Sequence, residues 1–403
     1  MTETHFFPAP EISFIPFCDG GALFYPKIQR LWALNPLASY IWLSLSDGIS
    51  KEKLISELVE RFSISSQTAE FDLNKILTHF ENEGLLGDGH PSQPNTTKET
   101  DLFIHDGQSI DSVDYSSSDN CCQIEAYGFT CKIYFPDKNL LNNFRHLYHY
   151  FLSEKSESIN QNILVLNSKE KNDAVDIYLD GRCVYKAVYR LKLDSTIHFI
   201  FFSQCAKYLS ALSKLMFHAA SVKKGNKTIV LPANSGSGKT TLTVALTACG
   251  WQCITDELAV LDLEELFISP LPIPMRIRSG SFTPLLPFYP SIPELPVFQD
   301  LYENSIRWIV LAEKNIVDKL ACSKITELIF PRYTENGCTE NATTELLILD
   351  KSKALEKLAA TGSSERDMTL EDAKAMVRLI EQTPCYELLF SDLHDAITAI
   401  ESI

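Results

Sequence analysis

Short runs of strand-forming residues open the chain and predict a small sheet. Residues 12–15 and 22–25 flank the turn Asp19–Gly21, and this arrangement predicts a β-hairpin. A further short strand is expected at residues 30–34. The first part of the chain is therefore expected to begin with a small antiparallel sheet.

The pattern then changes to hydrophobic residues at helical spacing, which predicts three helices. Asn35 is a favoured N-cap and Pro36 suits the first position of a helix, so the first helix should begin there. Two further helices are expected to begin near Ser50 and at Ser65 or its neighbour, and Gly84 suits the end of the last one. Strands followed by three short helices are typical of a winged-helix-like module.

From residue 121 onward, strand-like and helix-like segments alternate, as in an α/β protein. Strands are expected at residues 124–135, 162–166, 175–179, 183–191, 198–202, 229–232, 251–255, 325–330 and 385–390. Helices are expected at residues 140–151, 241–248, 351–360, 370–382 and 391–403. The apolar residues between Tyr208 and Met216 also recur at helical spacing and predict a buried helix. Ser391 is expected to cap the last helix.

The composition indicates a packed protein and argues against one class of partner. The chain has 403 residues, of which 45% are hydrophobic and 22% are charged, so we expect two or three folded domains. The formal net charge of −16 argues against a nonspecific nucleic-acid binder, because such a protein needs a basic surface.

Three features favour a cytoplasmic location. The N-terminus lacks the basic and apolar regions of a signal peptide. The most apolar stretch, residues 198–222, is interrupted by Lys207 and Lys214, so no membrane-spanning segment is expected. The 11 cysteines include no Cys-x-x-Cys pair and no zinc-type spacing, which suits free thiols in a reducing compartment.

Residues 229–241 have the pattern of a buried strand, a glycine-rich turn and a helix, which is the context of a Walker A phosphate-binding loop. In such a loop Lys239 lies near the β- and γ-phosphates, and Thr240 can place its hydroxyl on Mg²⁺. The usual first glycine is replaced by Ala233. The alternative is a glycine turn without a ligand. The predicted nucleotide-binding residues are Asn234, Ser235, Gly236, Ser237, Gly238, Lys239, Thr240 and Thr241.

Two adjacent carboxylates, Asp256 and Glu257, follow the predicted strand at residues 251–255. In open α/β sheets, ligands sit at this end of the strands. One carboxylate can hold Mg²⁺ while the other accepts the proton of an attacking hydroxyl. His218 is suited to orient that base. The alternative is a hairpin turn that leads into Leu258–Leu261.

His218, the glycine-rich loop and the Asp256-Glu257 pair together resemble the HPr serine kinase/phosphorylase family, in which two adjacent aspartates follow the loop. The resemblance implies a P-loop kinase in which Lys239 binds the phosphates and Asp256 is the base. It also implies that His218 lies near the base, and that Thr240 and Glu257 contact Mg²⁺. The family's segment for phosphorylase activity and HPr contact is not recognisable here, so HPr itself is not the expected substrate.

The N-terminal module resembles the PqqD family, the precursor recognition element of ribosomally made peptides. The resemblance rests on residues 34–48, on the helix that follows them and on residues 83–86, and it covers residues 10–88. It implies that the module binds the leader of a precursor peptide as an added β-strand. The alternative is a winged helix used for packing or for DNA binding. Residues 65–83 carry only Lys75 as a fixed positive charge, so DNA binding is not expected.

Three arginines are candidates for contacting a transferring phosphoryl group. Arg276 and Arg278 lie on one side of a short predicted strand, and Arg332 follows the strand at residues 325–330. This part of the chain also resembles HPr-kinase-related kinases from peptide-modifying gene clusters. The alternative for all three arginines is a surface position or an ion pair.

These observations predict the fold class α/β, with an HPr-kinase-like P-loop kinase domain at residues 121–403, a linker at 89–120 and a PqqD-like winged-helix α+β module at 1–88. The expected activity transfers a phosphoryl group from ATP (or GTP), with Mg²⁺, to a hydroxyl of a precursor peptide captured by its leader, and the expected acceptor is Ser or Thr rather than Tyr. The alternatives are a small-molecule or protein serine kinase, a kinase that activates a carboxylate, and a non-catalytic ATP-gated peptide chaperone. Neither nucleic acid nor a membrane is expected as a partner, and a homo-oligomer remains open.

Overall fold

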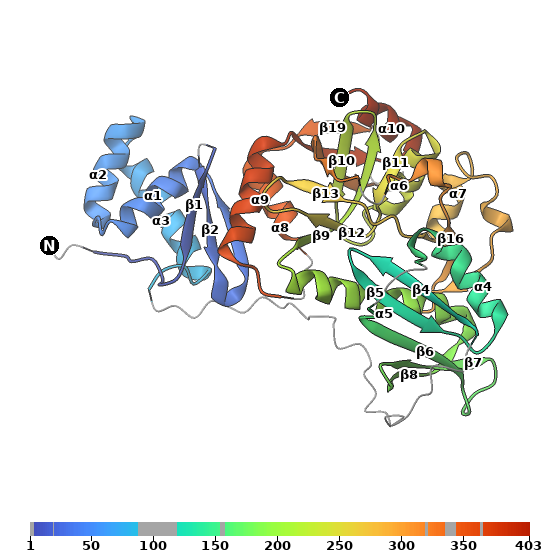
Figure 1. Cartoon of the computed structure of the whole chain (residues 1–403). Helices are drawn as coiled ribbons and strands as arrows, with labels where there is room; N and C mark the ends of the chain where they lie inside the picture. The colour runs from blue at the N-terminus through green and yellow to red at the C-terminus, as the bar shows by residue number, and fades with distance from the viewer. Residues whose placement is uncertain are drawn as a thin grey trace. The chain divides into compact units, whose positions relative to one another are not determined.

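The computed structural model is a mixed α/β protein (Figure 1). It describes residues 4–18, 20–87, 119–153, 158–318, 321–334, 344–362 and 366–403. The chain falls into two compact units: the first combines Met1–Thr97 with Ile348–Ala360 and Asp367–Cys385, and the second contains the rest. The predicted linker, 89–120, lies almost entirely outside the described residues, so the linker and the domain boundaries beside it stay predictions.

The first unit begins with a three-stranded antiparallel sheet in the order β1-β2-β3, followed by three helices. The elements are β1 (Ser13–Phe17), β2 (Gly20–Tyr25), β3 (Arg30–Leu34), α1 (Pro36–Ser46), α2 (Lys51–Phe62) and α3 (Ser66–Asn82). The side chains of Asn35, Ser50 and Ser65 each accept a hydrogen bond from a backbone N–H in the first turn of the helix that follows. The predicted hairpin, third strand and three helices are confirmed.

Two helices from late in the sequence complete the first unit, namely α8 (Lys351–Ala359) and α9 (Leu370–Gln382). Every residue of β2 from Gly21 to Tyr25 is buried, which in a strand means that both faces of the sheet are covered. Leu23 and Tyr25 pack in the cluster with α1–α3, whereas α8 contacts β3 and α9 contacts β1 and β2. The sequence pattern located both helices correctly, but it carries no signal for the sheet against which they pack.

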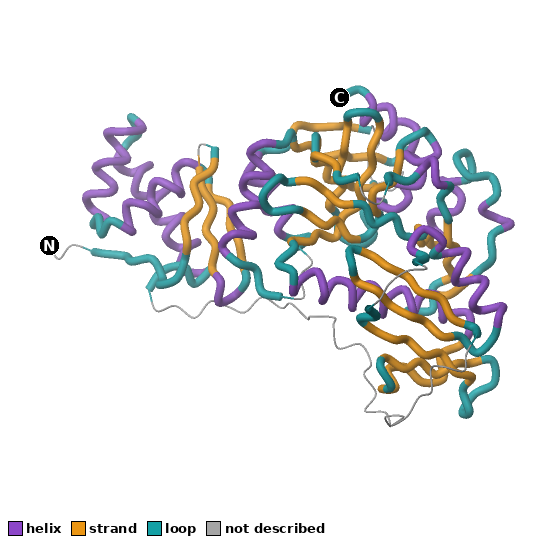
Figure 2. The backbone as a smooth tube through the Cα atoms, in the orientation of Figure 1, coloured by secondary structure: helices purple, strands orange, loops and turns teal. Residues whose placement is uncertain are grey.

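The second unit contains a five-stranded sheet in the order β4-β5-β6-β7-β8. Its strands are β4 (Cys121–Ala126), β5 (Phe129–Tyr134), β6 (Gln161–Asn167), β7 (Ala174–Leu179) and β8 (Arg182–Tyr189). β5 and β6 are parallel and are connected through α4 (Lys138–Leu147), whereas the other neighbours are antiparallel. The long helix α5 (Arg190–Ala211) packs against β5, β7 and β8 (Figure 2).

Helix α5 corrects two predictions. The predicted strand at residues 198–202 is wrong, because these residues lie within α5. The helix predicted from Tyr208 to Met216 is correct only as far as the end of α5. Beyond it, a turn at Ser213, with φ of 57°, leads into strand β9 (Leu215–Lys224). A helix that is buried on several sides has a nearly continuous apolar sequence, and pattern alone does not distinguish it from a buried strand.

A nine-stranded sheet forms the centre of the second unit, in the order β17-β13-β12-β9-β10-β18-β20-β19, and β11 also pairs with β9. Its other strands are β10 (Lys227–Pro232), β11 (Gln252–Thr255), β12 (Leu258–Leu261), β13 (Phe267–Ser269), β17 (Ser323–Lys324), β18 (Glu327–Tyr333), β19 (Glu345–Ile348) and β20 (Cys385–Phe390). Helix α6 (Lys239–Ala248) packs against β9 and beside α10 (Leu393–Glu401). A smaller sheet, in the order β14-β16-β15, consists of β14 (Met275–Arg278), β16 (Ser305–Ile309) and β15 (Phe298–Gln299). The short helix α7 (Phe282–Leu285) lies between β14 and β15 in the sequence.

The last helix begins at Leu393 rather than at the predicted Ser391. Asp392 caps it, and its side chain accepts hydrogen bonds from the backbone N–H groups of His394 and Asp395 at 2.8 and 3.0 Å. A carboxylate interacts with the positive end of the helix dipole as well as with these N–H groups, which favours Asp392 over the neighbouring hydroxyl.

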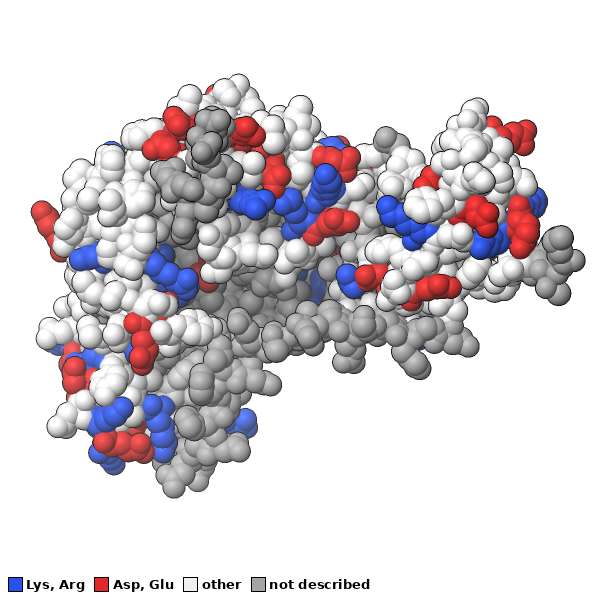
Figure 3. Space-filling view, turned by 180° about the vertical axis from the view of Figure 1, so that it is seen from behind, with Lys and Arg blue, Asp and Glu red and all other residues white. Residues whose placement is uncertain are grey.

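Among the helices that the structure describes, none combines the length and the apolar character needed to cross a membrane. On the face shown in Figure 3, the positive and negative side chains of the described residues are interspersed and form no continuous basic stripe. This distribution is consistent with the net charge of −16.

Candidate functional site

A cavity of about 1140 Å³ opens in the second unit where the turn after β10 meets α5, β14 and the start of α10. The sequence-predicted residues that line it are His218, Asn234, Ser235, Gly236, Ser237, Gly238, Lys239, Thr240, Thr241, Asp256, Glu257, Arg276 and Arg278. These residues come from separate strands, turns and helices, and the fold brings them to one cavity wall. The cavity is therefore the candidate functional site.

The turn after β10 has the backbone that a phosphate-binding loop needs. Gly236 and Gly238 have φ of 88° and 85°, in the left-handed region that strains residues with a Cβ. Gly238 is also enclosed, because an added Cβ would lie 3.0 Å from Phe390 and 3.2 Å from Tyr333. Ala233 does not have a positive φ. Its backbone therefore does not require glycine, which explains why alanine is accommodated at that position of the motif.

Replacing Gly238 with Ala is expected to weaken nucleotide binding. The added Cβ strains the backbone and meets Phe390, at a combined cost of about 1–3 kcal/mol that the loop relieves only by moving. Gly280→Ala is the matched control, because Gly280 lines the same cavity and an added Cβ there meets nothing within 4 Å. Calorimetric titration with ATP and Mg²⁺ should show weaker binding for Gly238→Ala alone. Equal affinities in both variants would contradict the assignment of this turn to phosphate.

Three buried polar atoms at the cavity have no hydrogen-bond partner among the described residues, namely Ser237 Oγ, Lys239 Nζ and Asp256 Oδ1. Lys239 is 6% exposed, and burial lowers its pKa although the nearby Asp256 and Glu257 carboxylates oppose this shift. A buried ammonium group is unfavourable unless an anion binds it. A phosphate chain supplies the oxygen acceptors that Lys239 and Ser237 need, so the turn fits a nucleotide.

Asp256 and Glu257 lie in the break between β11 and β12. Both strands pair with β9 and not with each other, so the alternative interpretation of this segment as a hairpin turn is wrong. The backbone N–H of Ala219 in β9 donates to the Glu257 carbonyl at 3.2 Å, which holds the break against the sheet. The two carboxylates and His218 of β9 therefore line the same cavity.

The two carboxylates differ in acidity. Burial raises the pKa of Asp256 to about 7, although the Lys239 charge opposes the shift. Burial also raises the pKa of Glu257, but the hydrogen bond from His198, together with the Arg276 charge, outweighs burial and holds this pKa well below its usual range. Two neighbouring carboxyl groups with separated pKa values provide one proton acceptor near neutral pH and one group that stays ionised.

His218 is uncharged near neutral pH. Burial and the positive charge of Lys239 lower its pKa to about 4, against the opposing effect of Glu257. Its backbone N–H donates to the Thr361 carbonyl at 2.7 Å, which fixes this part of β9. A neutral imidazole at the cavity wall can orient a neighbouring group by hydrogen bonding without adding a second positive charge beside Lys239.

His198 is a site residue that the sequence did not single out. It lies on α5, is 3% exposed, and its Nε2 atom is 3.2 Å from Glu257 Oε2. On its other side, Nδ1 is 2.5 Å from the Tyr148 hydroxyl oxygen. Because residues 198–202 were predicted to form a strand, the sequence did not indicate that His198 contacts Glu257. The available signal was a histidine inside an apolar helical run, because a buried imidazole needs hydrogen-bond partners.

Of the three predicted arginines, Arg276 and Arg278 line the cavity and Arg332 does not. Arg276 is half-buried in the cavity wall, and its charge lowers the pKa of Glu257, which places it near the carboxylates. Arg332 is exposed on β18 and does not line the cavity, whereas the adjacent Tyr333 does. Because side chains alternate along a strand, Arg332 points away from Tyr333. The structure does not bring Arg332 to the other site residues, and its role stays a prediction.

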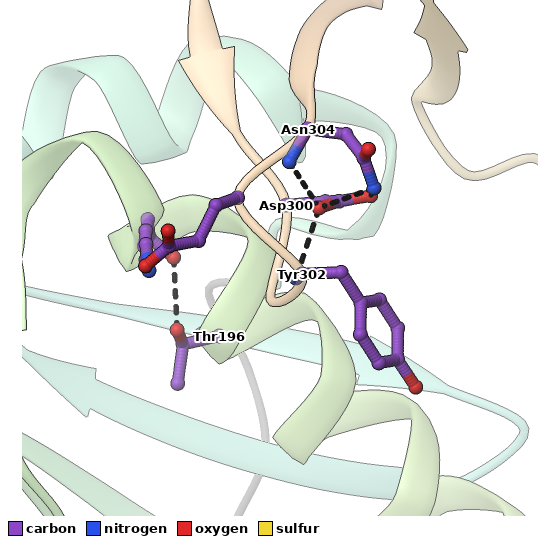
Figure 4. Close-up of polar contacts among 6 residues, drawn as sticks. Thr196, Asp300, Tyr302 and Asn304 are labelled. Carbon is purple, nitrogen blue, oxygen red and sulfur yellow. Dashed lines mark hydrogen bonds and ion pairs between the residues drawn. The ribbon is translucent and has the colours of Figure 1, made fainter.

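Arg278 is held at the cavity by a buried carboxylate. Its Nη2 atom lies 3.5 Å from Asp300 Oδ2, and Asp300 is fully buried. Asp300 also accepts hydrogen bonds from the backbone N–H groups of Tyr302 and Asn304 and from the Asn304 side chain, which close the loop shown in Figure 4. This loop presents the exposed ring of Tyr302 to the same cavity.

The oxygen atoms at the cavity suit Mg²⁺, which takes only some of its ligands from the protein. Among the described residues they do not form a site in which protein groups alone would hold an ion. No group of three or more His, Cys, Asp or Glu side chains within the described ranges could hold a metal ion. Mg²⁺ keeps several waters and takes one or two carboxylates together with substrate phosphates. Glu257 and Thr240, beside a phosphate-binding turn, match that requirement and leave Asp256 free to accept a proton.

Comparison with known proteins identifies the class of the N-terminal region. Residues 20–86 match the family model of coenzyme PQQ synthesis protein D (PqqD), and this range contains β2, β3 and α1–α3. The first unit thus carries a PqqD-like region in a mixed α/β protein, which confirms the predicted fold class at this level. No curated protein matched the chain.

Among solved structures, the HPr(Ser) kinase/phosphatase from Coxiella burnetii is similar to this chain. The two share 12% sequence identity, and the match covers 46% of this chain and 94% of that chain with a TM-score of 0.24. A TM-score this low does not transfer residue roles, so the interpretation of the cavity rests on its own geometry.

Proposed function

We propose that this protein is a phosphotransferase that moves the γ-phosphoryl group of ATP to a hydroxyl group of a ribosomally made precursor peptide. The observation that carries this proposal is one cavity that holds both a buried lysine with no hydrogen-bond partner among the described residues and two carboxylates with separated pKa values. The PqqD-like region supports a peptide as the acceptor, because proteins of that family bind precursor peptides.

In the proposed reaction, Lys239 and the backbone N–H groups of the turn would hold the phosphates, while Thr240 and Glu257 would hold Mg²⁺. When bound, the metal would supply positive charge to the phosphate oxygens. Asp256 takes the proton of the acceptor hydroxyl as the hydroxyl oxygen attacks the γ-phosphorus. The bond between the γ-phosphorus and its bridging oxygen breaks, and ADP leaves. Arg276, which lines the same cavity, would stabilise the negative charge on the transferring group.

The size and lining of the cavity support two ligands. Its volume of about 1140 Å³ exceeds the roughly 300–1,000 Å³ of a pocket for one small ligand. Aromatic rings of Phe199 and Phe202 line it from α5, and those of Tyr333 and Phe390 line it from β18 and β20. Capture of the leader by the first unit would raise the local concentration of the acceptor to roughly the millimolar range.

The experiment that tests this function uses the purified protein, γ-labelled ATP, Mg²⁺ and the precursor peptide encoded beside its gene. Label should appear on the peptide, and unlabelled GTP as competitor reports the nucleotide preference. The matched control is the same peptide with an unrelated leader, which should be labelled with a much higher KM. Deleting residues 1–88 is a poorer test, because α8 and α9 pack against that sheet and would be uncovered.

Each alternative predicts a different outcome of this experiment. A small-molecule kinase leaves the peptide unlabelled, and a leader-independent protein kinase labels both peptides equally. A kinase that activates a carboxylate gives a product that hydroxylamine cleaves. An ATP-gated chaperone binds ATP and peptide without transferring label. Because the proposed reaction needs ATP and newly made peptides together, we place it in the cytoplasm.

The value of kcat/KM is expected to rise with pH through about 7. Asp256 must be deprotonated to accept a proton, and burial raises its pKa to about 7, so the competent fraction falls roughly tenfold per pH unit below that value. His218, with a pKa of about 4, stays uncharged over this range and adds no transition. Initial rates at limiting peptide, measured from about pH 5 to about pH 9, check this. A flat profile through pH 7 would rule out Asp256 as the base.

A further inference from the structure

We propose that His198 is a positioning residue that holds the Glu257 carboxylate in the orientation in which it binds Mg²⁺, and that Tyr148 fixes the tautomer in which His198 does so. This inference rests on the proposed function, because it concerns how the same site holds its metal. His198 lies outside the sheet that carries the phosphate-binding turn, on helix α5.

The hydrogen bonds define a chain with one direction. An ionised carboxylate can only accept, so Nε2 of His198 carries the proton and donates to Glu257 Oε2, at 3.2 Å. In the neutral imidazole Nδ1 is then the acceptor, and it accepts from the Tyr148 hydroxyl, at 2.5 Å. Tyr148 is 1% exposed, and burial raises its pKa well above the usual value, so the hydroxyl keeps the proton that it donates. This chain leaves the other carboxylate oxygen of Glu257 available to the cavity.

Glu257 needs such support for a physical reason. Its side chain is 36% exposed, and a glutamate has one more rotatable bond than an aspartate. A freely rotating glutamate would lose more conformational entropy when it binds a metal than a held one. The N–H of His198 restricts that rotation before the metal arrives. Outer hydrogen-bond partners of metal ligands act in this way, and their loss costs about 10- to 100-fold in metal affinity.

The ring of His198 is itself held in place. It stacks on Phe202 with ring centroids 4.6 Å apart and lies 5.2 Å from the ring of Trp308. Helix α5 is tied at the preceding turn, where the Ser195 hydroxyl donates to the Gln299 carbonyl at 2.9 Å. Figure 4 shows Thr196 of the same turn near the loop that Asp300 closes. The imidazole therefore has a fixed place from which to orient Glu257.

The test measures Mn²⁺, an ion visible by electron paramagnetic resonance, bound to the full chain with a non-hydrolysable ATP analogue. His198→Leu removes the donor and should weaken Mn²⁺ binding by about 10- to 100-fold. His198→Gln keeps an N–H near the position of Nε2 and should restore most of the affinity. Tyr148→Phe removes the hydroxyl that fixes the tautomer of His198 and should give an intermediate loss of Mn²⁺ affinity. Ile200→Val is the matched control, since Ile200 is buried on the same helix and does not line the cavity.

Binding of the same analogue without metal shows whether a variant has lost the site altogether. The proposal expects metal-free affinity to be unchanged in His198→Leu and in His198→Gln. Mn²⁺ affinity equal to that of the unmodified protein in His198→Leu would overturn the proposal. So would equal losses in His198→Leu and His198→Gln, or a parallel loss of metal-free binding, because a purely structural role predicts those results.

This result is separable from the proposed function. Asp256→Asn, carried through the same titration, should keep the effect of His198→Leu on Mn²⁺ even though phosphotransfer is lost. If no peptide is phosphorylated but Mn²⁺ binding still depends on His198, the proposed function fails and the positioning role stands. If the peptide is phosphorylated and His198→Leu leaves the Mn²⁺ affinity unchanged, only the positioning role fails.

Discussion

Replacing Asp256 with Asn is expected to lower kcat for phosphotransfer by about 100- to 10,000-fold. Asparagine has the same shape but cannot accept the proton of the attacking hydroxyl. Nucleotide binding should be unchanged or tighter, because the substitution removes a negative charge close to Lys239 and to the bound phosphates. Steady-state kinetics and calorimetric titration of the same preparation separate these two effects.

The matched control for Asp256→Asn is Asp262→Asn. Asp262 follows β12 outside the cavity and forms an ion pair with Lys214 at 3.0 Å, so its loss should leave kcat unchanged. Peptide phosphorylation within a few-fold of the unmodified rate in Asp256→Asn would exclude Asp256 as the base. A product that hydroxylamine cleaves would then point to a carboxylate acceptor, for which that base is dispensable.

Replacing Lys239 with Met is expected to remove about half or more of the stabilisation that ATP and Mg²⁺ give to the protein. The ammonium group is buried and has no hydrogen-bond partner in the described part of the chain, so a phosphate oxygen is the partner for which it is placed. A hydrogen bond to a charged group contributes about 1.5–3 kcal/mol, so its loss weakens binding roughly 10- to 150-fold. Methionine has a similar length and keeps the packing of the pocket.

Thermal unfolding with and without nucleotide measures this effect. At a ligand concentration of about 100 times the unmodified Kd, the unmodified protein gains about 2.7 kcal/mol, and Lys239→Met should gain only about 0.3–1.4 kcal/mol at the same concentration. Lys314→Met is the control, because Lys314 is exposed and lies outside the cavity. An undiminished shift in Lys239→Met would mean that the nucleotide binds elsewhere or not through this turn.

The parts of the fold that could be predicted from the sequence depend on local signals. Asn35, Ser50 and Ser65 each cap a helix through their own side chains, so the helix starts could be located without knowing the fold. The glycines of the phosphate-binding turn likewise act through their own backbone angles. For the same reason, Asp256 and Glu257 could be recognised as a pair beside that turn.

The parts that could not be predicted depend on contacts between distant segments. Helices α8 and α9 were located correctly, but nothing in their sequence indicates that they cover the sheet of the first unit. The role of His198 depends on Glu257, which is 59 residues away in the chain, and on Tyr148, which is 50 residues away. The opposite pKa shifts of Asp256 and Glu257 also arise from this three-dimensional environment rather than from residue type.

Tandem mass spectrometry of the precursor peptide, after incubation with the protein, ATP and Mg²⁺, tests the central claim most directly. We predict a mass gain of one phosphoryl group on a Ser or Thr hydroxyl outside the leader, present with the unmodified protein and absent with Asp256→Asn. An unchanged peptide mass, under conditions in which the protein binds both the peptide and ATP, would contradict the claim that this cavity transfers phosphate to the peptide.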